Sequence, residues 1–326
     1  MRDDFTVLIG TIGTSIWRSS DGGSTWTRPK GERPKLPWSE LQCFDIAVDP
    51  TEPKTVFAGT NEGIYRSDDQ GASFELLDSP LNDYDVWSIA IDNVDTDTIF
   101  AGCRPGAVFR SRDGGLSWEK MSTQWAEHCA NVSVPRVLTL AIDPTDHNII
   151  WAGAEVDGIR RSLDGGDTWS RINSLAEPDI HFMVVSGGTP STVITSTAPE
   201  IYVSEDVGES WQGVGVARQF PMQFCRGLAI KPDDPNVIFA ANGNSFIGDN
   251  GRVLRSQDRG QTWETLDLTV EPNSPIWKIG VNRADPNLVL CNSHYGEIFC
   301  SEDAGDTWRK MDREFGEIRP VVWTPN

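Results

Sequence analysis

One octapeptide recurs seven times along this 326-residue chain and limits its fold more than any other feature. The copies follow the pattern Ser-x-Asp-x-Gly-x-Ser/Thr-Trp/Phe, and successive aspartates lie 42 to 52 residues apart. Seven matches at a nearly constant spacing indicate seven similar structural units. Their aspartates are Asp21, Asp69, Asp113, Asp164, Asp206, Asp258 and Asp303.

The recurring positions of the octapeptide suit a tight turn between two strands. The aspartate can accept hydrogen bonds from nearby backbone N–H groups, and the glycine adopts a positive φ without steric cost. The Trp or Phe then begins the next strand and buries a large ring. We interpret the aspartates as structural rather than as calcium ligands or catalytic groups, because a catalytic group is not needed seven times.

The segments around each octapeptide predict four short strands per unit. In the second unit these begin with 44–50, continue with 56–60 and 63–67, and end after the octapeptide. Short strands at this density, separated by turn residues, are typical of a β-propeller blade. The first unit lacks its innermost strand, and 317–325 reads as a spare one. We therefore predict an all-β fold: a single seven-bladed propeller domain (1–326) with four-stranded blades, closed by the C-terminal strand in the first blade.

These octapeptides resemble the Asp-box, or BNR repeat, over nearly the whole chain. Asp-box propellers include sialidases, xyloglucan-degrading glycoside hydrolases, sortilin-type receptors and the photosystem II assembly factor. The resemblance implies the propeller fold, and it implies either glycoside-hydrolase-like activity or a non-catalytic assembly role. Xyloglucanases of this kind pair two propellers with one catalytic Asp from each, and a single propeller supplies half of that arrangement.

Charge and cysteine content narrow the classes of partner and compartment. The chain has 28 Lys plus Arg against 48 Asp plus Glu, a net charge of −20, which disfavours nucleic-acid binding. It has neither a long apolar run nor an apolar N-terminal segment of the signal-peptide type. Six cysteines without a C-x-x-C pair indicate buried free thiols. We expect a cytoplasmic protein without membrane insertion.

We expect a binding site on the face opposite the octapeptide turns, here called the loop face. The variable links lie there and the central channel opens among them. The innermost strands can be aligned on a small central residue, and the side chain three positions earlier should then face the entrance. These entrance residues are Phe44, Trp87, Leu138, His181, Arg226, Trp277 and Arg319.

The entrance residues and their neighbours predict a cationic and aromatic funnel. Arginine binds carboxylate or phosphate, and aromatic faces suit sugar rings, so we expect a glycan or small anionic ligand. The alternative is that the arginines pair with acids on adjacent blades, such as Asp179 and Glu317. The candidates for ligand binding are Arg104, Trp87, Arg136, Arg226, Trp277, Lys278, His294, Tyr295 and Arg319. The candidates for hydrolase or lyase catalysis are Asp85, Glu155, Glu200 and His181.

No cofactor is expected at this site. The alternative, a divalent metal between His181 and His294, lacks any metal-binding spacing of histidines in the sequence. Three insertions, 27–41, 125–128 and 242–251, are expected on the loop face as a lid or a protein-interaction surface. Two functions remain open: an enzyme acting on a glycan or small anion, and a non-catalytic propeller that binds a protein partner.

Overall fold

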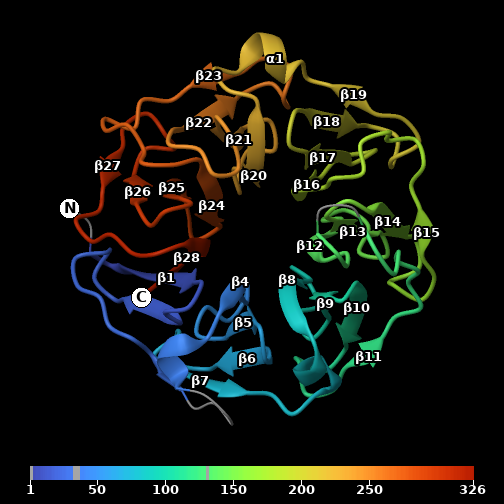
Figure 1. The fold of residues 1–326 in the computed structure, drawn as a ribbon, viewed down its shortest axis with the longest axis horizontal. Coiled ribbons are helices and arrows are strands. Elements are labelled where there is room, and N and C mark those ends of the chain that lie inside the picture. Colours follow the sequence, from blue (N-terminus) through green and yellow to red (C-terminus); the bar gives the residue numbers. More distant parts are fainter. Residues whose placement is uncertain (1–2, 32–36, 130–131) are drawn as a thin grey trace.

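The computed structural model describes residues 3–31, 37–129 and 132–326. Its strands form seven sheets that stand as blades around a central axis (Figure 1). The predicted seven-bladed β-propeller is therefore confirmed. Among the described residues, none of the helices is both long enough and apolar enough to cross a membrane.

Five blades contain four strands each, ordered from the innermost to the outermost. Blade 3 has β8 (Asp85–Ile91), β9 (Ile99–Arg104), β10 (Ala107–Ser111) and β11 (Glu119–Lys120). Blade 4 has β12 (Val137–Ile142), β13 (Ile150–Ala154), β14 (Gly158–Ser162) and β15 (Ser170–Arg171). Blade 5 has β16 (Phe182–Ser186), β17 (Thr192–Ser196), β18 (Ile201–Ser204) and β19 (Gln212–Gly213). Blade 6 has β20 (Phe224–Ile230), β21 (Ile238–Gly243), β22 (Gly251–Ser256) and β23 (Glu264–Thr265), and blade 7 has β24 (Ile276–Asn282), β25 (Asp285–Ser293), β26 (Ile298–Ser301) and β27 (Arg309–Lys310).

Blade 1 joins the two ends of the chain. The C-terminal strand β28 (Ile318–Pro325) pairs antiparallel with β1 (Phe5–Thr11), which pairs with β2 (Ile16–Ser19). A single bridge between Arg18 and Thr27 stands in place of a fourth strand. Trp323 of β28 is buried, and its ring centre lies 5.9 Å from that of Phe5. The prediction that the C-terminal strand closes the ring is confirmed.

Blade 2 has an additional outer strand that the sequence did not indicate. Its strands are β4 (Cys43–Val48), β5 (Val56–Thr60), β6 (Gly63–Ser67) and β7 (Ser73–Leu76), and β3 (Lys30–Gly31) pairs in parallel with β7. Trp38, from the same insertion, packs 5.3 Å from the ring of Tyr65. The described part of 27–41 therefore covers the outer edge of blade 2, and the prediction of a loop-face lid was wrong for it. Covering an exposed strand edge satisfies its free backbone groups, and 32–36 lie outside the described residues.

The octapeptide turns share one network of hydrogen bonds, illustrated by Asp69. Its Oδ1 accepts from the Ser67 hydroxyl and the Ser73 N–H, both at 2.8 Å, and its Oδ2 accepts from the Ser73 hydroxyl at 2.6 Å. The Gly71 N–H donates to the Ser67 hydroxyl at 2.8 Å. The residue before each octapeptide glycine also has a positive φ, between 57° and 71°. The two successive left-handed residues and the repeated network give these aspartates a structural role, as expected.

Arginines connect most adjacent blades through these turns. The residue just before the octapeptide serine is often arginine, and its guanidinium donates to the backbone carbonyl that follows the aspartate in the next blade. We call these residues clasp arginines. The pairs are Arg18 with Gln70, Arg66 with Gly114, Arg110 with Gly165, Arg161 with Val207 and Arg255 with Ala304. Arg309, from outer strand β27, closes the ring by donating to the Gly22 carbonyl at 3.4 Å.

The core lies between the blades, where each sheet packs on the next. Its largest fully buried side chains include Trp151, Trp323 and Tyr65. All six cysteines are free thiols, and five of them are buried in this core. The prediction of buried free thiols is confirmed for these five, and Cys129 is half-buried.

Candidate functional site

A β-bulge aims each of six entrance side chains toward the axis. In β8, Val86 pairs with Cys103 and Ser88 pairs with Gly102, so that Trp87 has no partner on β9. A bulge bends the strand and re-aims the extra side chain, and bulges are common beside binding sites. The same interruption of register occurs at Phe44, Leu138, Arg226, Trp277 and Arg319.

The seven entrance residues lie around one pocket at the centre of the loop face, here called the mouth pocket. Its volume is about 40 Å³. That is room for about one water molecule, whereas drug-sized ligands occupy roughly 300–1,000 Å³. As it stands, the pocket fits a small group such as a carboxylate rather than a sugar ring. Its lining consists of Phe44, Trp87, Leu138, His181, Phe182, Arg226, Trp277, Lys278 and Arg319.

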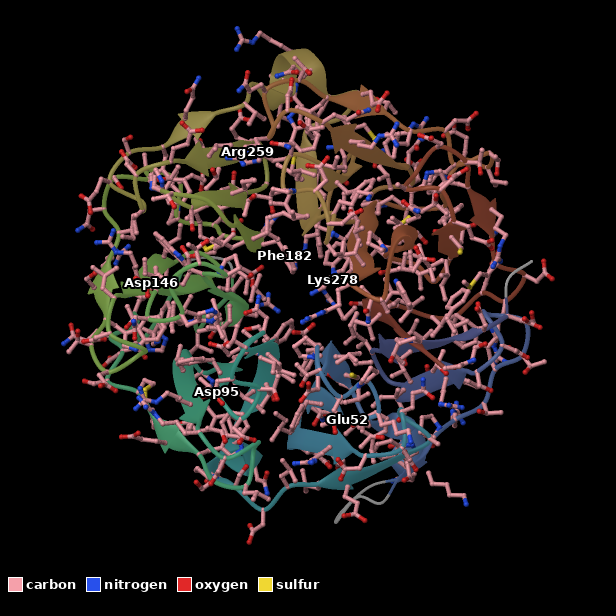
Figure 2. All side chains as sticks on the ribbon, turned by 180° about the vertical axis from the view of Figure 1, so that it is seen from behind. Glu52, Asp95, Asp146, Phe182, Arg259 and Lys278 are labelled. Carbon is pink, nitrogen blue, oxygen red and sulfur yellow. The ribbon has the colours of Figure 1, made fainter. Side chains whose placement is uncertain are left out.

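Lys278 and Phe182 narrow the centre of the ring, as Figure 2 shows from the opposite face. The Lys278 ammonium lies 4.3 Å from the centre of the Phe182 ring. It also lies 3.3 Å from Oδ1 of Asp45, and Oδ2 of Asp45 accepts the Ile89 N–H at 2.9 Å. Phe182 and Asp45 were not among the predicted site residues. Each directly follows an entrance residue, so the next position along each strand was the signal that could have found them.

Ion pairs neutralise most cations near the mouth pocket. Arg136 pairs with Glu155 across blade 4, and Arg319 pairs with Glu317, the residue just before its own strand β28. Arg104 lies 3.8 Å from Asp85, and Nε2 of His181 lies 3.5 Å from Asp179. The alternative interpretation, in which the arginines are paired, therefore describes these residues, although several pairs lie within one blade. In a half-buried ion pair of this kind the two charges compensate each other, so the arginine attracts an anionic ligand only weakly.

Arg226 differs from the other cations. Its guanidinium forms no ion pair or hydrogen bond within the described part of the chain, and it lies 4.3 Å from the Trp277 ring centre. Burial, followed by the nearby charge of Arg319, lowers the pKa of Arg226 to about 9. Burial also lowers the pKa of Arg319. Arg226 is therefore a half-buried cation that no carboxylate contacts directly, although the charges of Glu155 and Asp179 act on it.

Trp277 is the central stacking surface of the site. Arg319 lies 4.9 Å from its ring centre, and the His294 ring stacks on it at 4.1 Å. Tyr295 lies 4.8 Å from His294 and is 43% exposed. Burial and the charges of Arg319 and Arg226 lower the pKa of His294 to about 3, so this ring is neutral near pH 7. Trp87 forms a second stack, with Phe44 at 4.1 Å and Arg136 at 4.7 Å.

The three candidate acids lie in different environments. Burial raises the pKa of Asp85 above its usual value, against the opposing charges of Arg104 and Arg136. Glu155 is held by Arg136. Glu200 accepts the backbone N–H groups of Ile201, Gly215 and Val216, which ties it to the turn before α1 (Val216–Gln219). None of the three lines the mouth pocket.

The environment of His181 does not resemble a metal site. Its Nδ1 donates to the Cys225 carbonyl at 2.7 Å, and Nε2 faces Asp179. Both ring nitrogens are thus engaged. Within 3–31, 37–129 and 132–326, no group of three or more His, Cys, Asp or Glu side chains is placed to hold a metal ion.

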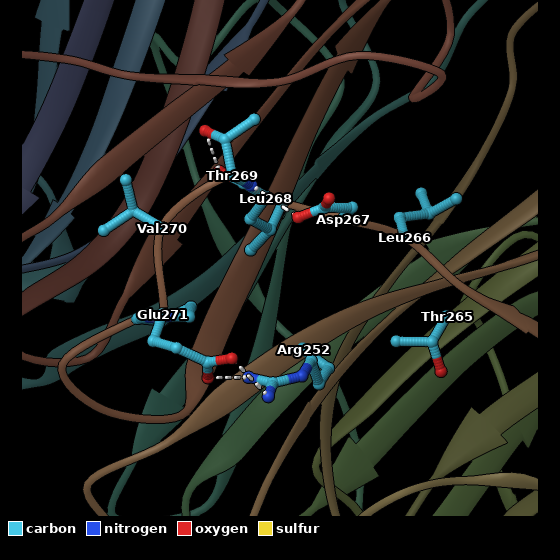
Figure 3. A pocket seen from close by; sticks show the side chains of 9 residues that line it. Arg252, Thr265, Leu266, Asp267, Leu268, Thr269, Val270 and Glu271 are labelled. Carbon is cyan, nitrogen blue, oxygen red and sulfur yellow. Dashed lines mark hydrogen bonds and ion pairs between the residues drawn. The ribbon is translucent and has the colours of Figure 1, made fainter.

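Further hollows lie away from the axis. Figure 3 shows one of about 270 Å³ beside the link 265–272, where Nη1 of Arg252 lies 2.6 Å from Glu271. A second, of about 440 Å³, lies beside the insertion 125–128, where the Arg160 guanidinium covers the Trp125 ring at 4.4 Å. A third, of about 790 Å³, lies between blades 5 and 6. In the insertion 242–251, the ring of exposed Phe246 lies 6.4 Å from His294.

The chain is similar to proteins of more than one kind. It is 29% identical over 252 residues to the xyloglucanase Xgh74A of Acetivibrio thermocellus, an alignment that covers 63% of this chain and 29% of that enzyme. It is 21% identical over 279 residues to the photosystem II assembly lipoprotein Ycf48 of a Synechococcus species, covering 83% of this chain and 78% of that protein. Its relatives thus include an enzyme and an assembly factor. No protein-family model matches the chain.

The structural comparison supports the same fold. The crystal structure of the GH74 xyloglucanase from Xanthomonas campestris covers 99% of this chain with a TM-score of 0.72 and 18% sequence identity. The match takes up 52% of the Xanthomonas chain. This chain therefore spans about half of that solved enzyme and 29% of the length of the curated xyloglucanase.

Proposed function

We propose that this propeller binds an anionic ligand at the mouth pocket of its loop face. The observation that carries the proposal is Arg226, a half-buried guanidinium that forms no ion pair or hydrogen bond within the described residues. Burying a charge is costly unless an opposite charge compensates it. A carboxylate or phosphate group of a ligand would supply that charge and would also reach Arg319, which lies 4.9 Å from the centre of the same Trp277 ring.

The ligand we propose is an acidic sugar or an acidic glycan. The pocket admits its charged group, and the rest of the molecule would lie outside, against Tyr295 and Phe246. Exposed aromatic rings suit the apolar faces of sugar rings. Two features favour a glycan: the likeness to xyloglucanases, and the assignment of the octapeptides to the Asp-box repeat. We take residues 1–326 as one domain. The proposed binding needs neither metal nor cofactor.

Isothermal titration with D-glucuronate, N-acetylneuraminate and inorganic phosphate tests this proposal, with D-glucose as the neutral control. We expect saturable binding of an anionic probe and none of glucose. Arg226→Gln should weaken that binding by about tenfold or more, because a charge-assisted hydrogen bond is lost. Arg255→Gln, a clasp arginine near the other face, should leave the affinity unchanged. Equal affinities in wild type and Arg226→Gln would overturn the proposal.

A second candidate function is glycoside hydrolysis. It is favoured by Asp85, whose raised pKa suits a general acid, and by Glu155, which pairs with Arg136 and would act as the base. His181 would then position the substrate. Release of 4-nitrophenol from 4-nitrophenyl glycosides, a glucuronide among them, tests this function. Loss of activity in Asp85→Asn would support hydrolysis. If the wild type hydrolyses none of the glycosides, ligand binding remains as the proposed function.

A further inference from the structure

The interface between blades 5 and 6 lacks the arginine clasp found at the other six. The position before the octapeptide serine in blade 5 is Val203. Blade 7 has Cys300 at this position, but Arg309 from β27 replaces the missing clasp there. No other arginine does so between blades 5 and 6, and within the described residues the Arg259 carbonyl accepts no hydrogen bond.

The octapeptide turn at this interface also leaves the most space beside its glycine. Each octapeptide glycine faces the preceding blade closely. A Cβ atom added at the other six glycines would lie 2.4 to 3.0 Å from its nearest neighbour, whereas at Gly260 the nearest atom, on Trp263, is 3.5 Å away. Gln219 of α1 spans part of the gap by donating to the Gln261 carbonyl at 3.3 Å. The absence of a clasp thus coincides with a gap.

A groove of about 790 Å³ opens at this gap. Val203, Trp211 and Val214 provide its apolar surface, and Glu205 lies at its edge. The Glu205 carboxylate is exposed and makes no contact with a cation of the described chain. At the corresponding position of blade 2, Asp68 lies 2.9 Å from clasp Arg66. The groove therefore retains the two acceptors of the Arg66 clasp, a carbonyl and a carboxylate, without the guanidinium. Three other clasp arginines pair with an acid of the next blade at the position that Gln261 occupies here.

We propose that this groove is a docking site for an arginine side chain presented by a partner protein. The guanidinium would donate to the Arg259 carbonyl and to Glu205, as Arg66 donates to Gly114 and Asp68 at the equivalent positions. Val203 and Trp211 would contact its methylene groups. The chain carries a net charge of −20, which favours a basic partner.

Two arginines of the chain also border this groove, and they could attract a ligand of the opposite charge. Nε of Arg259 donates to Asn236 Oδ1 at 3.0 Å, which draws this side chain toward the link 231–236. Arg218 belongs to the short helix α1 at the other end of the groove. An acidic peptide would bind through these two arginines, whereas an arginine peptide would bind through the clasp acceptors. Comparing the affinities of an acidic and an arginine peptide therefore separates the two possibilities.

The test uses the intact chain and the peptide acetyl-Leu-Arg-Leu-amide, with binding followed by tryptophan fluorescence or NMR. The citrulline analogue has the same shape without the charge. We expect the arginine peptide to bind about tenfold more tightly than the citrulline peptide. Val203→Arg should supply the missing clasp, abolish peptide binding and raise the melting temperature, and Val203→Leu should retain binding.

Glu205→Gln provides a second test, one that does not introduce a larger side chain at the interface between blades 5 and 6. We expect it to weaken binding of the arginine peptide several-fold, with the melting temperature unchanged. Arg226→Gln should leave this binding intact, which separates the groove from the proposed ligand at the mouth pocket. Equal binding of the two peptides, tighter binding of acetyl-Leu-Glu-Leu-amide, or unchanged affinity in Val203→Arg would overturn the proposal.

Discussion

The guanidinium of Arg226 lies 4.3 Å from the ring centre of Trp277, and this aromatic face takes the place of a carboxylate partner. A cation–π contact is worth about 0.5–2 kcal/mol, which offsets only part of the cost of burying the charge. Arg319, 4.9 Å from the same ring, adds repulsion. An anion bound in the mouth pocket would therefore relieve the repulsion between Arg226 and Arg319.

This arrangement predicts that Arg226→Met makes the protein more stable while removing anion binding. Replacing a buried charge by an apolar side chain of similar length is often neutral or stabilising by about 1–4 kcal/mol. Arg319→Met is the matched control, because it leaves Glu317 without its partner and should lower the free energy of unfolding. Urea unfolding measures both. A strongly destabilised Arg226→Met would show that Arg226 has a structural role.

The octapeptide network predicts that Asp69→Ala lowers the free energy of unfolding by about 1–2 kcal/mol, since three hydrogen bonds to its carboxylate are lost. Asp68→Ala removes the neighbouring exposed carboxylate, which pairs with Arg66 and accepts a long hydrogen bond of 3.4 Å from the Thr55 hydroxyl, and should change stability by less than about 1 kcal/mol. Comparing the two urea midpoints tests the assignment. Similar losses in the two variants would contradict it.

Acid should destabilise the protein partly through His294. The pKa of this side chain is lowered to about 3 by burial and by Arg319 and Arg226, against 6.5 in the unfolded chain. Between these values the unfolded state binds a proton that the folded state does not, so stability falls as the pH drops from 6.5 toward 3. His294→Phe retains a ring against Trp277 and cannot titrate. The stability of His294→Phe relative to wild type should therefore increase steadily as the pH is lowered from 6.5 toward 3. A difference in stability that stays constant over this range would contradict the prediction.

Closure of the ring by β28 predicts a large effect of Trp323→Ala. Trp323 is 2% exposed, its ring contacts Phe5, and its indole N–H donates to the Leu288 carbonyl at 3.1 Å. Removing a buried Trp side chain typically costs about 3–5 kcal/mol. We expect one cooperative unfolding transition at a lower urea concentration. Separate unfolding of blade 1 would instead show that closure does not stabilise the other blades.

The octapeptides predicted the number of blades, because their turn chemistry repeats with little change, and the spare strand 317–325 predicted the closure. The entrance positions followed from aligning the innermost strands, and all seven lie around the mouth pocket. Their function as binding or catalytic residues remains a prediction. The bulges that aim Trp87 and Trp277 inward were not foreseen, since each depends on how two strands fall into register.

Side-chain pairing across blades could not be predicted from spacing. Lys278 and Asp45 are 233 positions apart in the sequence and lie 3.3 Å apart across the axis. The clasp arginines repeat visibly before the octapeptide serine, yet their acceptor is a backbone carbonyl, which carries no sequence pattern. Likewise, the insertion 27–41 gave no indication that β3 would pair with an outer strand.

The pairing of β1 with β28 also places the two described ends of the chain side by side: the Asn326 N–H donates to the Asp4 carbonyl at 3.4 Å (Figure 1). Proximity of this kind is what circular permutation requires. In a ring closed in this way, the fold does not require the chain to start in a particular blade. A permuted chain whose old ends are joined by a short linker, and which starts in any link between blades, would keep the same seven sheets. The order in which the blades are synthesised is thus separable from the structure they form.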